Sequence, residues 1–136
     1  MDEVVRAGVR QRLSRAEGKL RAARLLAQAG EVDDAISRAY YAAFHAAQAA
    51  LIALGHEARS HEGVVMLFGL HLIETGKIER RLGRGLHRLR GDRESGDYAT
   101  TTFFAAEDAA EAIRSADDLL GAVRVWLRGE FPGDFA

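Results

Sequence analysis

Residues 36–54, with the sequence ISRAYYAAFHAAQAALIAL, decide the fold of this chain. On a helix this segment carries apolar residues on two stripes, so the helix is apolar nearly all round. Such a helix lies at the centre of a domain or in a subunit interface. The stretch from Ala39 to Leu54 contains His45 and Gln48 and is only 16 residues long, so we expect no membrane insertion.

The flanking segments have helical periodicity as well. Residues 9–27, 61–73, 78–89 and 105–126 repeat apolar side chains at helical spacing. Helix ends are expected at Gly30, Thr75-Gly76 and Gly129 with Pro132, and helix starts at Asp33 or Asp34, at Ser60 and near Thr100–Thr102. No segment alternates with period two, so the sequence predicts an all-α, up-and-down antiparallel bundle of about five helices. We expect one domain over residues 1–130 and a short C-terminal tail over residues 131–136.

The composition limits the chemistry and the compartment. A chain of 136 residues with no cysteine and one proline excludes disulfide scaffolds and thiolate metal clusters. His56, Glu57, His61 and Glu62 lack the organised spacing of a metal site, and Gly83-Arg84-Gly85 lacks the third glycine of a dinucleotide fingerprint. We therefore expect neither a metal nor a cofactor. Charged residues interrupt the apolar run that a signal peptide needs at the N-terminus, so we expect a cytoplasmic protein.

The net charge of −1 hides two charge blocks. From Lys77 to Arg93, seven Lys/Arg stand against two acids, a local +5, whereas nine acids against three arginines give −6 over residues 94–136. The outward-facing cations of the basic block are Arg80, Arg84 and Arg88, together with His87. This face is either a solvated helix surface or one that follows the phosphates of RNA or a nucleotide. Between the blocks, Arg93 and Asp97 are expected to pair, and Tyr98 to anchor the turn.

Polar residues of the central helix fall on one line. They are Asp34, Arg38, Tyr41, His45 and Gln48, at spacings of four and three residues. One interpretation is a solvated helix edge, or a hydrogen-bond ladder in which Asp34 pairs with Arg38. The other is the lining of a cleft, in which Arg38 binds phosphate bidentately, His45 transfers a proton, and Tyr41 and Gln48 contact the substrate.

Several motifs, taken in order, resemble the small bacterial and archaeal HEPN-domain proteins. They are Ser37-Arg38-Ala39-Tyr40-Tyr41-Ala42-Ala43-Phe44-His45-Ala46-Ala47, Gly55, Ser60-His61-Glu62-Gly63-Val64, Phe68, Thr75-Gly76, Arg93 and Asp97-Tyr98. The likeness covers about residues 5–127. It implies a helical bundle that is usually a homodimer and is often encoded beside a minimal nucleotidyltransferase as a toxin–antitoxin pair.

In active members of that family, the resemblance implies a metal-independent ribonuclease whose motif is arginine, four to six residues, then histidine. Arg38 and His45, with six residues between them, have this spacing, as do Arg81 and His87, with five. The family's motif normally lies near the start of the last helix, where this chain has Arg93 and no later histidine.

Three hypotheses follow for the function. In a ribonuclease toxin, a ribose 2′-hydroxyl attacks the adjacent phosphate, with His45 as general base or acid and Arg38 stabilising the charge on phosphorus. In a non-catalytic dimer, Arg38, Tyr41 and the basic block, including Arg80, Arg84, Arg88 and Arg93, present a nucleotide or RNA to the nucleotidyltransferase. A third hypothesis is a helical adaptor that docks another protein. A homodimer would bring two polar lines together into one cleft.

Overall fold

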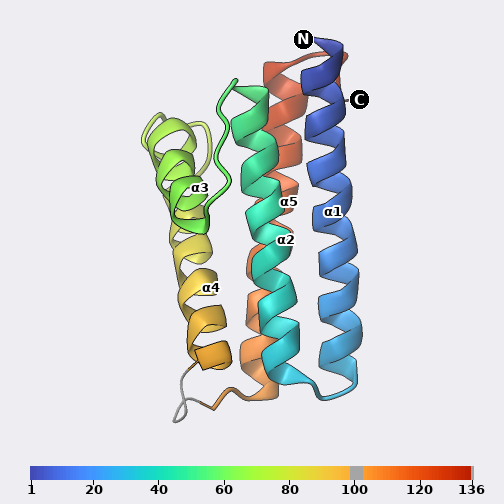
Figure 1. Ribbon diagram of the computed structural model, residues 1–136, viewed down its shortest axis with the longest axis vertical. Helices are drawn as coiled ribbons and strands as arrows, with labels where there is room; N and C mark the ends of the chain where they lie inside the picture. Colours follow the sequence, from blue (N-terminus) through green and yellow to red (C-terminus); the bar gives the residue numbers. More distant parts are fainter. Residues whose placement is uncertain (99–102, 136) are drawn as a thin grey trace.

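The computed structural model describes residues 1–98 and 103–135, and of residues 97 and 98 it describes only the backbone. The elements are α1 (Glu3–Gln28), α2 (Val32–Ala53), α3 (His61–Phe68), the π-helix η1 (Gly69–Ile73), α4 (Arg80–Tyr98) and α5 (Ala106–Glu130) (Figure 1). Residues 1–98 and 103–135 contain no strand, and the predicted all-α, up-and-down bundle is confirmed. The expected Arg93–Asp97 ion pair and the Tyr98 anchor lie outside the described side chains. The last helix does not start near Thr100–Thr102 as predicted: residues 103–105 are not helical, and α5 begins at Ala106 after the extended N-cap Ala105, with the Asp108 carboxylate accepting from the Ala105 N–H at 2.8 Å.

The central position predicted for the alanine-rich helix is found for α2. It lies between α1 on one side and α3 with α4 on the other, and α5 lies behind it (Figure 1). More than half of its residues are buried, most of them alanines, so neighbouring backbones approach closely. Tyr40 and Phe44 are its buried aromatic residues, and both stack on His61 of α3. None of the described helices combines the length and the apolar character needed to cross a membrane.

The start of α2 differs from the sequence prediction. Neither Asp33 nor Asp34 is the N-cap, because α2 begins at Val32 and its N-cap, Glu31, makes no side-chain capping bond. The reason is the way α1 ends: Gly30 has a φ of 80°, and the Glu31 N–H donates to the carbonyl oxygen of Leu26 at 2.9 Å. Because α1 ends in this tight turn, α2 begins earlier in the sequence than predicted. Both aspartates therefore lie in the first turn of α2, where their negative charges interact favourably with the helix dipole.

The next two helix ends follow the prediction more closely. Ser60 caps α3 by accepting a hydrogen bond from the Gly63 N–H at 2.9 Å, as expected. The helix predicted to run to residue 73 changes at Gly69 into the π-helix η1, whose last bond runs from the Glu74 N–H to the Gly69 carbonyl at 2.9 Å. Gly76, with a φ of 76°, then turns the chain toward α4.

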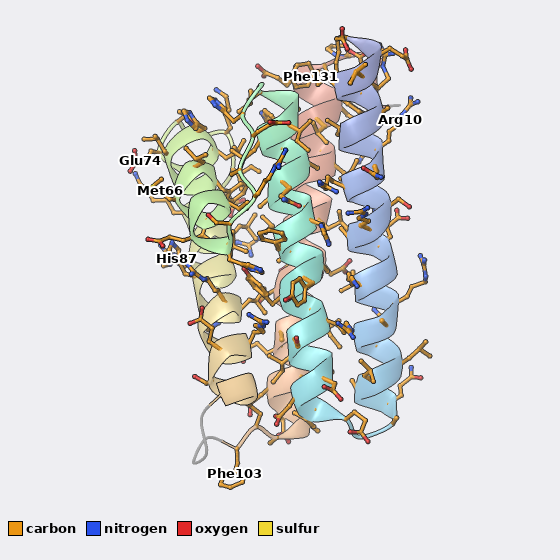
Figure 2. All side chains as sticks on the ribbon, in the orientation of Figure 1. Arg10, Met66, Glu74, His87, Phe103 and Phe131 are labelled. Carbon is orange, nitrogen blue, oxygen red and sulfur yellow. The ribbon has the colours of Figure 1, made fainter. Side chains whose placement is uncertain are left out.

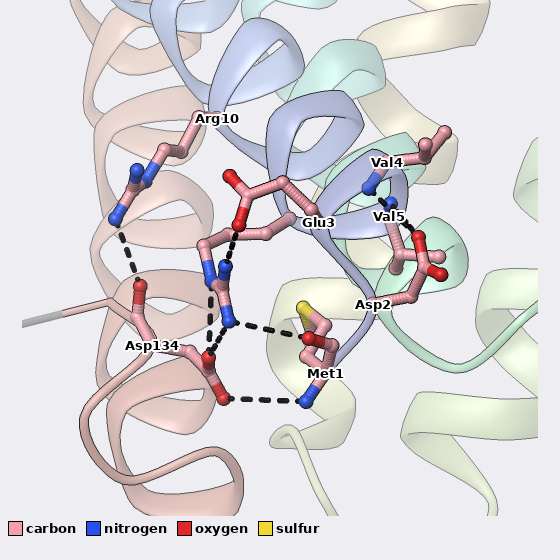
Figure 3. A network of polar contacts seen from close by, with 8 residues as sticks. Met1, Asp2, Glu3, Val4, Val5, Arg10 and Asp134 are labelled. Carbon is pink, nitrogen blue, oxygen red and sulfur yellow. Dashed lines mark hydrogen bonds and ion pairs between the residues drawn. The ribbon is translucent and has the colours of Figure 1, made fainter.

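The C-terminal residues fold back onto the start of α1, so that both ends of the chain meet (Figure 3). The Asp134 carboxylate accepts from Arg6 at 2.6 and 3.0 Å, and its backbone carbonyl accepts from Arg10 at 3.1 Å. The hydrogen bond from Arg6 holds the pKa of Asp134 below its ordinary value. The rings of Phe131 and Phe135 pack edge-on against each other, so residues 131–135 are docked on the bundle.

Candidate functional site

Four polar residues share one face of α2, here called the α2 strip: Arg38, Tyr41, His45 and Gln48. Their spacing places them on one line of the helix. The strip lies between α1 on one side and α3 with α4 on the other, because Tyr41 contacts residues of α3 and α4 whereas the charges that lower the pKa of His45 belong to α1. Tyr41 and His45 are half-buried, so the middle of the strip is partly open to solvent.

His61, at the start of α3, is held against the edge of the strip by aromatic rings. It stacks on Phe44 with the ring centroids 4.6 Å apart, and the Tyr40 hydroxyl lies 2.6 Å from its Nδ1. Burial raises the pKa of the fully buried Tyr40 to about 12, so the phenol keeps its proton. A buried O–H needs an acceptor, and we therefore assign the Tyr40 hydroxyl as the donor to Nδ1 of His61. In neutral His61 the ring proton is therefore on Nε2. Burial, with a smaller effect of Arg93, lowers the pKa of His61 and keeps this neutral form.

His45 has the opposite tautomer, set by a chain of hydrogen bonds. The side-chain N–H of Gln48 donates to the carbonyl oxygen of Ala58 at 3.3 Å, which turns the amide oxygen toward His45. That oxygen lies 3.2 Å from Nδ1 of His45, so Nδ1 carries the proton and donates it. The other nitrogen, Nε2, keeps its lone pair. Burial lowers the pKa of His45, and nearby cations of α1 lower it further.

Both histidines contact the ring of Phe44. The ring of His45 is 5.6 Å from the Phe44 centroid, and that of His61 is 4.6 Å from it. The two imidazoles are thus separated by no more than the sum of these distances, about 10 Å. One ring presents a lone pair and the other an N–H, so the pair offers both a proton acceptor and a hydrogen-bond donor.

Cations flank the strip from two helices. Arg12, Arg15 and Lys19 of α1 are the charges that act on His45. On the other side, the guanidinium carbon of Arg93 lies 5.3 Å from the centroid of the Tyr41 ring, a cation–π contact. Arg90 belongs to the same side, where its Nε lies 3.3 Å from the carboxylate of Glu94. The flanks therefore favour an anionic ligand.

Of the residues predicted to form a site, four come together. They are Tyr41, His45, Gln48 and Arg93. Arg38 is exposed on the same strip, but it lies two turns and about 10.5 Å of helix rise from His45. The remaining three, Arg80, Arg84 and Arg88, are exposed on α4 away from the strip, and Arg88 donates to the Ser115 hydroxyl of α5 at 3.4 Å. His87, on the same side of α4, points outward (Figure 2).

Tyr40, His61 and the α1 cations were not predicted as site residues from the sequence. Their signals were present: Ser60-His61 is one of the family-like motifs, and Arg12, Arg15 and Lys19 follow one another at helical spacing. Within residues 1–98 and 103–135, no group of three or more His, Cys, Asp or Glu side chains could hold a metal ion. The strip and its edge offer two imidazoles, those of His45 and His61, among arginines and a lysine.

Comparison with known proteins identifies the family. Residues 9–126 match the family model of the HEPN domain. A UPF0332 protein of Pyrococcus horikoshii is 46% identical over 77 residues, 57% of this chain and 54% of that protein, so the chain spans about half the length of this relative. A candidate toxin of Methanocaldococcus jannaschii is 34% identical over 113 residues, 83% of each protein. The chain belongs to the HEPN domain family.

A solved structure gives the same fold. The crystal structure of a protein from Thermus thermophilus superposes with a TM-score of 0.75 over 88% of this chain and 98% of that chain, at 21% sequence identity. At that identity the likeness concerns the fold alone.

Proposed function

We propose that this protein is the toxin of a toxin–antitoxin module and that it cleaves RNA at the α2 strip without a metal. One observation carries the proposal: His45 and His61 both contact the Phe44 ring, between cations of α1 and α4. The name of the Methanocaldococcus relative as a candidate toxin agrees with it. A polyanion with a nucleophilic hydroxyl beside each phosphate is the substrate that this combination fits.

In the proposed reaction, Nε2 of His45 takes the proton of a ribose 2′-hydroxyl. The 2′-oxygen forms a bond to the adjacent phosphorus, and the bond from phosphorus to the 5′-oxygen breaks, which leaves a 2′,3′-cyclic phosphate. The 5′-oxygen takes a proton from water, and His45 returns its proton to solvent. Proton transfer of this kind contributes about 10²–10⁴ in rate.

The charge that develops on the phosphate oxygens needs donors. The Nε2–H of His61 supplies one, and the Arg93 guanidinium beside Tyr41 supplies another. Arg38 is the alternative to Arg93 in this role, and its exposed position on the strip also suits a contact to the next phosphate along the strand.

The partner and the assembly belong to the same proposal. We expect a cytoplasmic homodimer whose two strips form one RNA-binding cleft, and a minimal nucleotidyltransferase as the antitoxin. The alternative function is a non-catalytic dimer that binds RNA or a nucleotide through the same strip, and Arg80, Arg84 and Arg88 would extend that surface along α4. The lack of any histidine after His87 favours this alternative, because the usual family motif places one there.

The test is cleavage of a mixed RNA by purified protein in the presence of EDTA, with mapping of the product ends. We expect cyclic phosphate ends, and a loss of about 100-fold or more in His45→Ala. His61→Ala and Arg93→Ala should lose about tenfold to 100-fold each, and Arg38→Ala tests the alternative. His87→Ala tests the other arginine–histidine pair with this spacing, because it removes an exposed histidine on the outer side of α4 (Figure 2). Arg21→Ala, which removes an exposed cation of α1, is the control and should leave cleavage unchanged.

Two results would decide against the ribonuclease. Equal cleavage by the wild type and by His45→Ala would assign the activity to a contaminant or to another site. Salt-dependent RNA binding by a folded dimer that leaves the RNA intact would favour the non-catalytic alternative.

A further inference from the structure

A small cavity lies between α1, the C-terminal half of α2 and the loop that follows α2. Its volume is about 130 Å³. It is lined by Arg12, Gln48, Leu51, Ile52, His56, Glu57, Ala58 and Arg59. Pockets that take whole small molecules measure about 300–1,000 Å³, so this one suits a single functional group.

The loop forms a fixed wall of this cavity. The N–H of His56 donates to the Leu51 carbonyl at 2.9 Å, and the Ala58 carbonyl accepts from Gln48 at 3.3 Å. The ring of His56 stacks on that of His71 in η1, with the centroids 3.9 Å apart. The loop before Arg59 is thus tied to the helices, and the cavity is preformed.

Cationic donors dominate the lining. The buried Nε of Arg12 has no hydrogen-bond partner within the described residues, although a buried N–H normally has one. Arg59 brings a second guanidinium, and Glu57 is the only carboxylate among the lining residues. The amide of Gln48 is already engaged at both ends, so the donors that remain for a ligand are those of the arginines and His56.

We infer that this cavity binds one phosphate group, held by Arg12 and Arg59. Guanidinium groups bind phosphate bidentately, and the two arginines outweigh the single carboxylate of Glu57, so the lining is net positive and attracts either a terminal phosphate or the singly charged phosphodiester of a strand. The phosphate comes either from an RNA strand or from a free nucleotide. If the phosphate belongs to RNA, the site is a second contact for the substrate of the proposed ribonuclease, and the inference then rests on that proposed function. Gln48 lines the cavity and also accepts a hydrogen bond from His45, so a phosphate bound here would determine which phosphodiester bond of the strand reaches His45.

The test uses inorganic phosphate and no RNA, at constant ionic strength, with the backbone amides of residues 55–60 followed by NMR. We expect saturable shifts in the wild type, and affinity at least about tenfold weaker in Arg12→Gln and in Arg59→Gln. Arg21→Gln is the matched control, because Arg21 is exposed on α1 nine residues, or about 180°, from Arg12. Glu57→Gln should bind a few-fold more tightly, since it removes a negative charge from the cavity.

Two results would overturn the inference. One is the absence of saturable shifts at residues 55–60 in the wild type. The other is equal weakening by Arg12→Gln and Arg21→Gln, which would mean diffuse attraction by α1 as a whole. Thermal unfolding of each variant separates lost binding from lost folding, and Arg59→Gln, in an exposed loop position, tests the site without altering a helix.

Competition experiments identify the source of the phosphate. Displacement of inorganic phosphate by a nucleoside monophosphate, but not by the nucleoside, supports a free nucleotide. Displacement by an RNA oligomer without terminal phosphates supports the strand, and displacement by neither overturns the inference. Phosphate binding by a protein that cuts no RNA would support the cavity and refute the ribonuclease. Cleavage without any response of residues 55–60 to phosphate would refute the cavity alone.

Discussion

Replacing Gln48 by glutamate tests the hydrogen-bond chain that sets the state of His45. The amide oxygen of Gln48 lies 3.2 Å from Nδ1 of His45. A carboxylate at that separation attracts an imidazolium by about 1 kcal/mol in bulk water and about 5 kcal/mol at an effective dielectric constant of about 20. Since His45 is half-buried, the gain lies between these limits, and at about 1.4 kcal/mol per pKa unit the pKa of His45 should rise by about 1–4 units.

The assay is a pH titration of the His45 ring by two-dimensional ¹H–¹⁵N NMR, which also reports the tautomer. Burial and the α1 cations hold the pKa of His45 below its ordinary value in the wild type, and Gln48→Glu should bring it to that value or above. Gln48→Met is the control, because it keeps the bulk and adds no charge, so the pKa should stay low. A pKa in Gln48→Glu within a few tenths of the wild-type value would refute the contact between these side chains, and with it the tautomer assigned to His45.

Three further predictions concern stability. Tyr40→Phe removes the O–H that lies 2.6 Å from Nδ1 of His61, so the free energy of unfolding should fall by about 1 kcal/mol, measured as a decrease of a few degrees in Tm. The pKa of His61 should rise, because the lost hydrogen bond favoured the neutral ring. Folding lowers the pKa values of His45 and His61 below that of a histidine in the unfolded chain. In urea titrations the free energy of unfolding should therefore be at its full value above about pH 6.5 and should decrease as the pH falls through the folded-state pKa values. The decrease should be smaller in His45→Ala. Gly83→Val should destabilise the protein by about 1–3 kcal/mol, because a Cβ at this position would lie 3.0 Å from a side-chain carbon of η1. Gly91→Ala, where the added Cβ meets open space, should stabilise it by up to about 1 kcal/mol. Thermal melts that rank the two variants the other way would contradict the packing of α4 on η1.

The helices were predictable because the signals that define them are local. Apolar spacing along 9–27 and 105–126 identified α1 and the body of α5, and the glycines at 30 and 76 ended helices as expected. The start of α2 was not predictable from Asp33 and Asp34, because it depends on the ending of α1. The change to a π-helix at Gly69 likewise has no signature in hydrophobic spacing, which is nearly the same for both helix types.

The candidate site was predictable only along α2. Helical spacing put Tyr41, His45 and Gln48 on one line, because that relation lies within a single element. The partners that give these residues their chemical state come from elsewhere in the chain. His61 reaches Tyr40 from the start of α3, and the carbonyl that orients Gln48 belongs to Ala58 of the loop. Such contacts depend on tertiary packing, which spacing does not encode.

The cations of α1 and α4 that lower the pKa values of His45 and His61 are also the charges that a bound RNA strand would neutralise. While the strip is empty, Arg12, Arg15 and Lys19 disfavour a second positive charge on His45 and keep its Nε2 lone pair available. Phosphates bound beside these side chains would offset that repulsion, so His45 would become more basic when substrate is in place. Under the proposed mechanism this is the favourable order, because the base stays unprotonated until RNA arrives and then gains affinity for the 2′-hydroxyl proton.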